Sequence, residues 1–183
     1  IWAGRSVLGN TTTNNTLTVN GTTHRDAYGG WTAGTGTTAA AKDNSIRNTV
    51  HFKTGSNVRN IYGGFTAAAG GNATDNSVNI SGGTVAPVSG VGGNVYGGYL
   101  SHASATGNAT GNTVTITGGS MGDVYGGYTN GTGATTGNTV NLGTEADAVA
   151  AGTSIGTIYG GSKPTATDNT LNVYSTVTAG NIA

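Results

Sequence analysis

Two short motifs alternate along this chain at nearly regular intervals, and this repetition constrains the fold more than any other feature. The tripeptide Tyr-Gly-Gly recurs five times, with spacings of 34, 34, 29 and 34 residues. The motif Asn-[Ser/Thr]-[Val/Leu] occurs six times between and beside these copies. Such self-similarity is the signature of a stacked repeat architecture. The tyrosines are Tyr28, Tyr62, Tyr96, Tyr125 and Tyr159, and the asparagines are Asn15, Asn48, Asn76, Asn112, Asn138 and Asn169.

Degenerate copies of the tyrosine motif stand at both ends of the sequence. Residues 1–4 read Ile-Trp-Ala-Gly, and residues 180–183 read Gly-Asn-Ile-Ala. The repeat therefore passes through about six periods, each roughly 30 residues long as in other repeat architectures, and ends in the phase in which it began. We expect residues 1–183 to form a single repeat domain, either a segment of a longer rod or a fibre subunit.

The residues of the asparagine motif alternate between apolar and polar, which predicts half-buried β-strands. Val114 and Ile116, for example, are separated by Thr115. One repeat has too few apolar residues to bury its own face, whereas stacked repeats bury a continuous core. We therefore predict an all-β fold, a parallel β-solenoid (β-helix) of about six coils of roughly 30 residues each. The expected core positions are Leu17, Val19, Val50, Phe52, Val78, Ile80, Val114, Ile116, Val140, Leu142, Leu171 and Val173.

Stacking also predicts ladders of identical side chains. The six motif asparagines are expected to form a structural ladder inside the coil or at its turn, because stacked amides hydrogen-bond from coil to coil. The tyrosines have two interpretations. They either face outward as a platform for sugar rings or partner proteins, or pack over the neighbouring Gly-Gly and serve stability alone. A second, partial aromatic column is expected at Trp31, Phe65, Tyr99 and Tyr128. Segments 84–93 and 143–156 are the expected protruding loops.

Composition excludes several classes of function. The chain has no cysteine, so it forms no disulfide and no thiolate metal site. Its formal net charge is zero, which gives no field for nucleic acid. No apolar run is long enough for a membrane helix, so direct membrane insertion is not expected. We expect neither cofactor nor metal.

Catalytic candidates are sparse, and we expect no enzyme. The histidines His24, His51 and His102 occupy different phases of the repeat. Stacked carboxylates of a polysaccharide-acting β-helix enzyme remain an alternative, because Asp43, Asp75 and Asp168 each precede an asparagine.

An ice-binding surface is another alternative, since one outward column carries Thr or Ser in every coil. Its neighbouring column is interrupted by His51 and three asparagines, so good β propensity on a wet face is the simpler explanation.

Residues 112–119, Asn-Thr-Val-Thr-Ile-Thr-Gly-Gly, are followed by Asp-Val-Tyr-Gly-Gly-Tyr at 123–128. Residues 76–83 and 94–99 repeat this arrangement. In repeat style the whole chain resembles the β-helical passenger region of autotransporter-type bacterial surface adhesins. The resemblance implies an extracellular or cell-surface rod that acts in attachment or aggregation, with no catalytic residues. The implied partners are glycans or receptors on host or bacterial surfaces.

A self-assembling filament is the main alternative to an adhesive rod. Unpaired solenoid edges are templates for further strands, and contacts that do not close on themselves give filaments. Under this hypothesis the end coils stack on those of a second copy. The residues expected at that contact are Ile1, Trp2 and Ile182.

Overall fold

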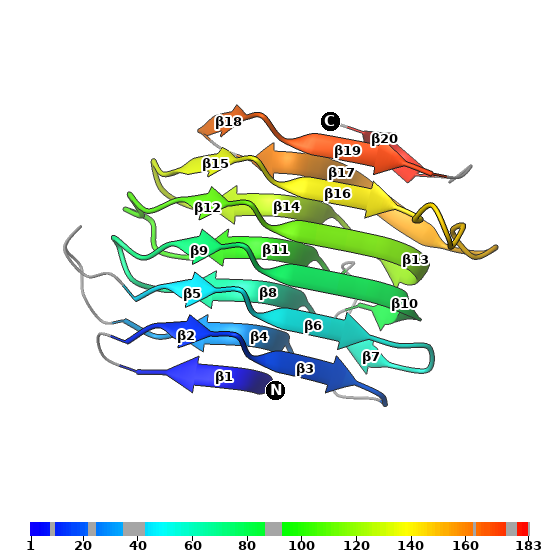
Figure 1. Ribbon diagram of the computed structural model, residues 1–183, viewed down its shortest axis with the longest axis horizontal. Helices are drawn as coiled ribbons and strands as arrows, with labels where there is room; N and C mark the ends of the chain where they lie inside the picture. The colour runs from blue at the N-terminus through cyan, green and yellow to red at the C-terminus, as the bar shows by residue number, and fades with distance from the viewer. Residues whose placement is uncertain are drawn as a thin grey trace.

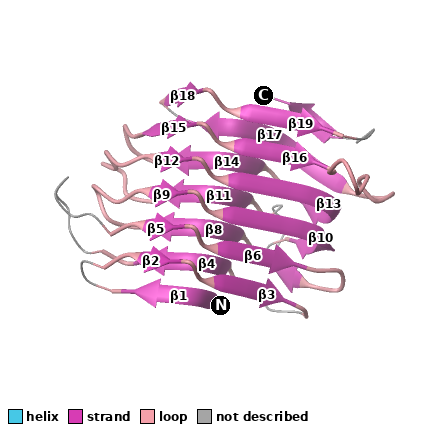
Figure 2. Cartoon of the chain, viewed as in Figure 1, coloured by secondary structure: helices cyan, strands magenta, loops and turns pink. Residues whose placement is uncertain are grey.

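The computed structural model describes residues 1–7, 10–21, 25–34, 43–86, 93–162, 164–174 and 179–182. For 179–182 it describes the backbone. These stretches contain twenty β-strands and no helix. Figure 2 draws the strands in magenta and the loops between them in pink. In the stretches described, no helix is therefore long and apolar enough to cross a membrane.

Three parallel ladders of strands run from the first coil to the last, upward in Figure 1. The tyrosine ladder consists of β1 (Trp2–Ser6), β4 (Ala27–Thr32), β8 (Ile61–Thr66), β11 (Val95–Leu100), β14 (Val124–Thr129), β17 (Ser154–Ser162) and β20 (Ala179–Ile182). The asparagine-motif ladder consists of β3 (Thr16–Val19), β6 (Thr49–Phe52), β10 (Ser77–Val85), β13 (Thr113–Met121), β16 (Thr139–Leu142) and β19 (Thr170–Val173). The short ladder consists of β2 (Thr12–Thr13), β5 (Ser45–Ile46), β9 (Ala73–Thr74), β12 (Ala109–Thr110), β15 (Ala134–Thr136) and β18 (Thr165–Thr167).

The architecture is an all-β parallel β-solenoid, but the expected six coils of about 30 residues are not matched in detail. Paired motif asparagines are 36 residues apart at Asn76 and Asn112, but only 26 residues apart at Asn112 and Asn138. A fourth column joins β7 (Asn57–Val58) to the end of β10, the end of β13 and the start of β17. With this column included, about four turns carry the full set of strands. Coil length varies because segments of different length connect strands whose register is conserved.

The apolar side of the asparagine-motif ladder forms the core, as its alternation predicts. Val50, Phe52, Val114 and the other central positions are fully buried. The positions on the first and last strands depart from the prediction. Leu17 and Leu171 are only partly buried, and Val173 is 53% exposed. Among the described strands, β3 and β19 each have one neighbour in this ladder, so one flank of each side chain stays uncovered.

The Gly-Gly of the tyrosine motif has a steric cause. A Cβ on Gly98 would lie 2.5 Å from Nδ2 of Asn112, and one on Gly97 would lie 2.4 Å from the carbonyl oxygen of Gly126. The first glycine therefore makes room for the next coil, and the second makes room for the asparagine of its own coil. The same close approach recurs between Gly64 and Asn76. The two sequence motifs are thus halves of one packing unit.

Candidate functional site

The six motif asparagines form a continuous hydrogen-bonded ladder through the interior. Asn112 Nδ2 donates to Oδ1 of Asn138 at 2.9 Å and to the carbonyl oxygen of Ala73 at 2.9 Å. Its Oδ1 accepts from the backbone N of Asn76 at 3.0 Å and from Nδ2 of that residue at 2.9 Å. The central four asparagines are buried. The same arrangement joins Asn15, Asn48, Asn76, Asn112, Asn138 and Asn169 in sequence.

Two further ladders of Asn and Asp side chains lie at other corners, and the sequence reasoning missed both. The first comprises Asn44, Asn72 and Asn108. The second comprises Asp26, Asn60, Asn94 and Asp123, each two residues before a ladder tyrosine. That fixed position, Asn or Asp before Val, Ile or Ala and Tyr, was the signal that could have revealed the second ladder. In both ladders a later coil donates to an earlier one, opposite to the direction of the motif asparagines.

The five ladder tyrosines form a column of offset-stacked rings on the outer face of the tyrosine ladder. Successive ring centroids are 4.8, 5.0, 5.1 and 4.7 Å apart, with interplanar angles of 3° to 8°. The second column, Trp31, Phe65, Tyr99 and Tyr128, stacks in the same way and meets the first edge to face. Neighbouring rings therefore cover the faces of the interior tyrosines, and the outside receives mainly ring edges.

Three of these tyrosines, Tyr28, Tyr96 and Tyr125, hydrogen-bond through their hydroxyl groups to the corner ladder. Tyr28 Oη donates to Oδ2 of Asp26 at 3.2 Å, and Asn94 Nδ2 donates to Oη of Tyr96 at 3.2 Å. Burial, followed by the charge of Asp26, raises the pKa of Tyr62 well above its ordinary value. The Tyr62 hydroxyl is therefore uncharged at physiological pH.

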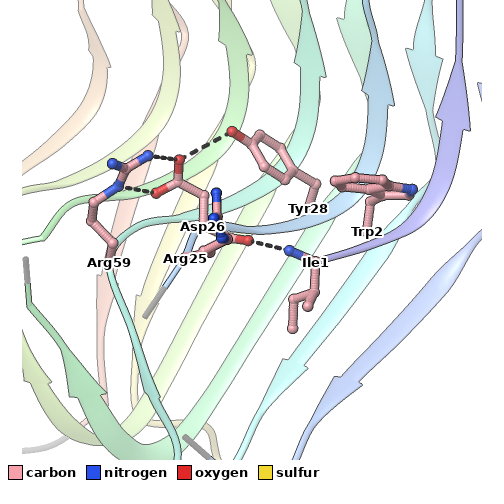
Figure 3. A pocket seen from close by; sticks show the side chains of 6 residues that line it. All are labelled: Ile1, Trp2, Arg25, Asp26, Tyr28 and Arg59. Atoms are coloured by element: carbon pink, nitrogen blue, oxygen red, sulfur yellow. Dashed lines mark hydrogen bonds and ion pairs between the residues drawn. The ribbon is translucent and has the colours of Figure 1, made fainter. Parts of the chain in front are cut away.

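A hollow of about 410 Å³ opens beside the first coil (Figure 3). Arg59 Nε donates to Oδ1 of Asp26 at 2.8 Å, and the guanidinium also reaches Oδ2 of the same carboxylate. Burial alone would raise the pKa of Asp26, but hydrogen bonds from Arg59 and Asn60 outweigh it and lower that pKa. Trp2 lies at the edge of the hollow and is 53% exposed. The Arg5 guanidinium lies 5.3 Å from the Trp2 ring centroid and 4.9 Å from that of Trp31, within the range of cation–π attraction.

The catalytic candidates are not brought together. Asp75 and Asp168 occupy the corner position directly before a ladder asparagine, with φ of 54° and 56°. Two intervening coils carry glycine there, so the two carboxylates are three rungs apart, about 14 Å at ordinary strand spacing. Asp43 lies at another corner, where its carbonyl oxygen accepts from Thr32 and Thr66. The residues directly before the six ladder asparagines all have positive φ; they are Asn14, Arg47, Asp75, Gly111, Gly137 and Asp168.

The two described histidines, His51 and His102, are equally dispersed. His51 faces outward on β6, and Nδ1 of His102 accepts from the backbone N of Ser104 at 3.0 Å. His24 lies outside the described residues. Within the described stretches, no group of three or more His, Asp or Glu residues is placed to hold a metal ion.

A shallow groove of about 230 Å³ lies on the outer face of the asparagine-motif ladder. Its floor includes His51, Asn79 and Thr115, and Thr144 and Asp147 border it. The predicted loop 143–156 supplies this border, but it is shorter than expected because β17 begins at Ser154. Of the other predicted loop, 84–93, residues 84–85 belong to β10 and 87–92 lie outside the described residues.

Of the three residues predicted to form an end-to-end contact, the structure describes the side chains of Ile1 and Trp2 but not that of Ile182. Ile1 and Trp2 are exposed on the first coil. The backbone of Ile182 pairs in register with Ile158, and its side chain is not among the described ones. Comparison with protein-family models, curated proteins and solved structures finds no match for this chain.

Proposed function

We propose that this chain is a non-enzymatic structural and adhesive rod at a bacterial cell surface or in the extracellular space. The observation that carries the proposal is the buried asparagine ladder, which ties each coil to the next by side-chain hydrogen bonds as well as by strand pairing. Polar networks that are fully satisfied hold one arrangement rigidly. A rigid solenoid displays its outward side chains at a fixed spacing, which suits attachment.

The outer faces supply the adhesive half of the proposal. The interior tyrosines are less suited to stacking on sugars than their sequence suggests, because their ring faces lie against each other. Binding to glycans or receptors then uses ring edges, hydroxyl groups and the polar face that carries His51, Asn79 and Thr115. This proposal keeps the cell-surface glycans and receptors implied by the family resemblance as partners.

A filament formed by continued stacking is the second candidate, and the direction of the asparagine ladder favours it. Among the described residues, Asn169 on the last rung has no ladder asparagine above it to accept from its N–H, and Asn15 on the first has none below it to donate to its Oδ1. One end therefore offers donors where the other offers acceptors. The exposed large apolar side chains of the described residues all lie on the first or last coil; they are Ile1, Trp2, Val7, Val173 and Tyr174. A further coil stacked on each end, from adjoining sequence or from a second copy, would cover these side chains.

Electron microscopy of the purified chain over a concentration series separates the two candidates. Short rods of constant length that bind bacterial or host cells support the adhesive rod. Threads that lengthen with concentration support the filament. Val173→Glu should shorten such threads by burying a charge at the junction, whereas the matched outward change Thr139→Glu should not. Rods that neither bind cells nor lengthen would count against both candidates.

A further inference from the structure

We infer that the groove on the outer face of β6, β10 and β13 binds a single neutral sugar residue of a larger glycan. This inference rests on the adhesive half of the proposed function and gives it a location. It places the site away from the tyrosine column and away from both end coils. The groove is formed by central coils alone, so it does not depend on what covers the ends of the solenoid.

The floor of the groove is a row of outward polar side chains in strict register. His51 pairs with Asn79, and Asn79 pairs with Thr115. Neighbouring strands lie about 4.8 Å apart, so the row presents one polar group per strand along the rod. A flat row at this spacing offers several hydrogen-bonding groups to the ring substituents of one sugar.

The Asn79 amide is less engaged than the amides farther along the same row. Asn172 Nδ2 donates to Oδ1 of Asn141 at 2.9 Å, and Asn141 Nδ2 donates to Oγ1 of the groove residue Thr115 at 3.2 Å. By contrast, Asn79 Nδ2 makes one long contact, 3.4 Å to Oγ of Ser77. Among the described residues, the carbonyl oxygen and second N–H of the Asn79 amide have no partner, and both remain open to a ligand.

The wall of the groove is pre-formed. The backbone N of Thr144 donates to the carbonyl oxygen of Asp147 at 2.7 Å, and the backbone N of Asp147 donates to Oγ1 of Thr144 at 2.9 Å. The loop is also pinned to β13, because the N of Ala150 donates to the carbonyl oxygen of Thr117 at 2.8 Å. Val149 packs against the hydrophobic core. A wall fixed in this way spares the ligand the entropy cost of ordering it.

The chemistry of the lining selects the ligand class. Asp147 provides a carboxylate and Asn79 an amide, two planar groups that each bridge adjacent hydroxyls of a sugar. The positive charge of Lys53 balances that of Asp147, which favours a neutral sugar over a uronic or sialic acid. The volume of about 230 Å³ lies below the ~300–1,000 Å³ of pockets for drug-sized ligands. It suits one ring of a longer chain.

The test is a titration of the isotope-labelled chain with neutral and, separately, acidic monosaccharides and disaccharides, followed by NMR. An open, hydrogen-bonding groove predicts a dissociation constant on the order of millimolar. Chemical-shift changes should centre on His51, Asn79, Thr115 and the 144–147 turn. Asn79→Ala and Asp147→Ala should each weaken binding about tenfold. Asn172→Ala is the matched control, since it removes an amide from the same row, touches no residue that lines the groove and should leave binding unchanged.

The outcomes separate the site from the wider function. Shift changes confined to Trp2 and Tyr28, or binding that survives both groove variants, would overturn the groove and leave the adhesive function standing. Binding of acidic sugars alone would overturn the assigned ligand class. If no sugar binds while the chain still attaches to cells, the groove fails and a protein receptor is indicated. If the chain attaches to no cell either, the adhesive function itself fails. All three variants change outward side chains, and circular dichroism verifies that each retains the fold.

Discussion

Replacing the buried ladder residue Asn112 by alanine should destabilise the fold far more than an ordinary surface substitution. The side chain makes four hydrogen bonds, two as donor and two as acceptor, and it is fully buried. Alanine removes all four and leaves an amide N–H of Asn76 and the carbonyl oxygen of Ala73 without their partners. Water cannot reach this position to replace them while the coils stay stacked.

The magnitude follows from the number of bonds. A typical hydrogen bond contributes about 0.5–1.5 kcal/mol net, and orphaned buried groups cost more. We therefore expect Asn112→Ala to lower the free energy of unfolding by about 4 kcal/mol. Asn169→Ala is the matched control. That asparagine makes three side-chain hydrogen bonds but is only half-buried on the last rung, so water replaces them and the loss should be about 1 kcal/mol.

Urea unfolding followed by circular dichroism gives the free energies, and hydrogen exchange locates the damage. Coils of a solenoid interact with their nearest neighbours, so weakening one junction should broaden the transition or divide it in two. The backbone amide of Asn76, which donates to Oδ1 of Asn112, should lose protection first. A loss below about 1 kcal/mol, or unchanged protection of Asn76, would refute the view that the ladder holds the coils together.

Three further predictions concern other parts of the fold. Gly98→Ala should lower the free energy of unfolding by several kcal/mol, because the new Cβ would meet Nδ2 of Asn112. Gly137→Ala is the control: with φ of 62° and open space around it, alanine should cost about 1 kcal/mol through backbone strain alone. Similar losses at both sites would contradict the packing argument. Val114→Asp buries an unpaired charge at a fully buried position, so the melting temperature should fall by many degrees. A change of a degree or two would show that the stacked core is wrongly assigned. Burial raises the pKa of Tyr62 in the folded state. Its contribution to stability should therefore be constant below the ordinary tyrosine pKa of 10.0 and fall as pH rises above it. Tyr62→Phe should reduce this loss of stability at alkaline pH, which urea unfolding at several pH values measures.

The parallel solenoid and most of its core follow from the sequence because a period of two inside a longer repeat has few structural solutions. Phe52, Ile80 and Ile116 are buried where the alternation places them. The number of complete turns did not follow as well. Motif spacing counts every repeat, whereas a complete turn also requires the short fourth column, whose strand β7 is only two residues long. Pairings of that length leave almost no periodic pattern to detect.

The candidate site was predicted less well than the fold. Tyrosine periodicity shows which residues share a column, but not whether ring faces or ring edges meet the solvent. That orientation depends on the second column, whose rings pack edge to face against the first. The groove beside β13 depends on a loop that folds back through Val149 and Ala150. Nothing periodic marks such a contact, because it occurs in a single coil.

The orientation of the strands across the rod has a mechanical consequence. Their hydrogen bonds run along the solenoid axis, so a pulling force on its two ends acts on all junctions between coils in series, and these junctions open one at a time. The hydrogen-bonded corner residues Asp26 and Asn60 lie 34 residues apart, which is the length of the coil between them. That coil adds about 4.8 Å to the rod while folded and about 110 Å of chain once peeled away. Under tension such a molecule lengthens in large discrete steps, and each step dissipates the work of breaking the hydrogen bonds between one coil and the next.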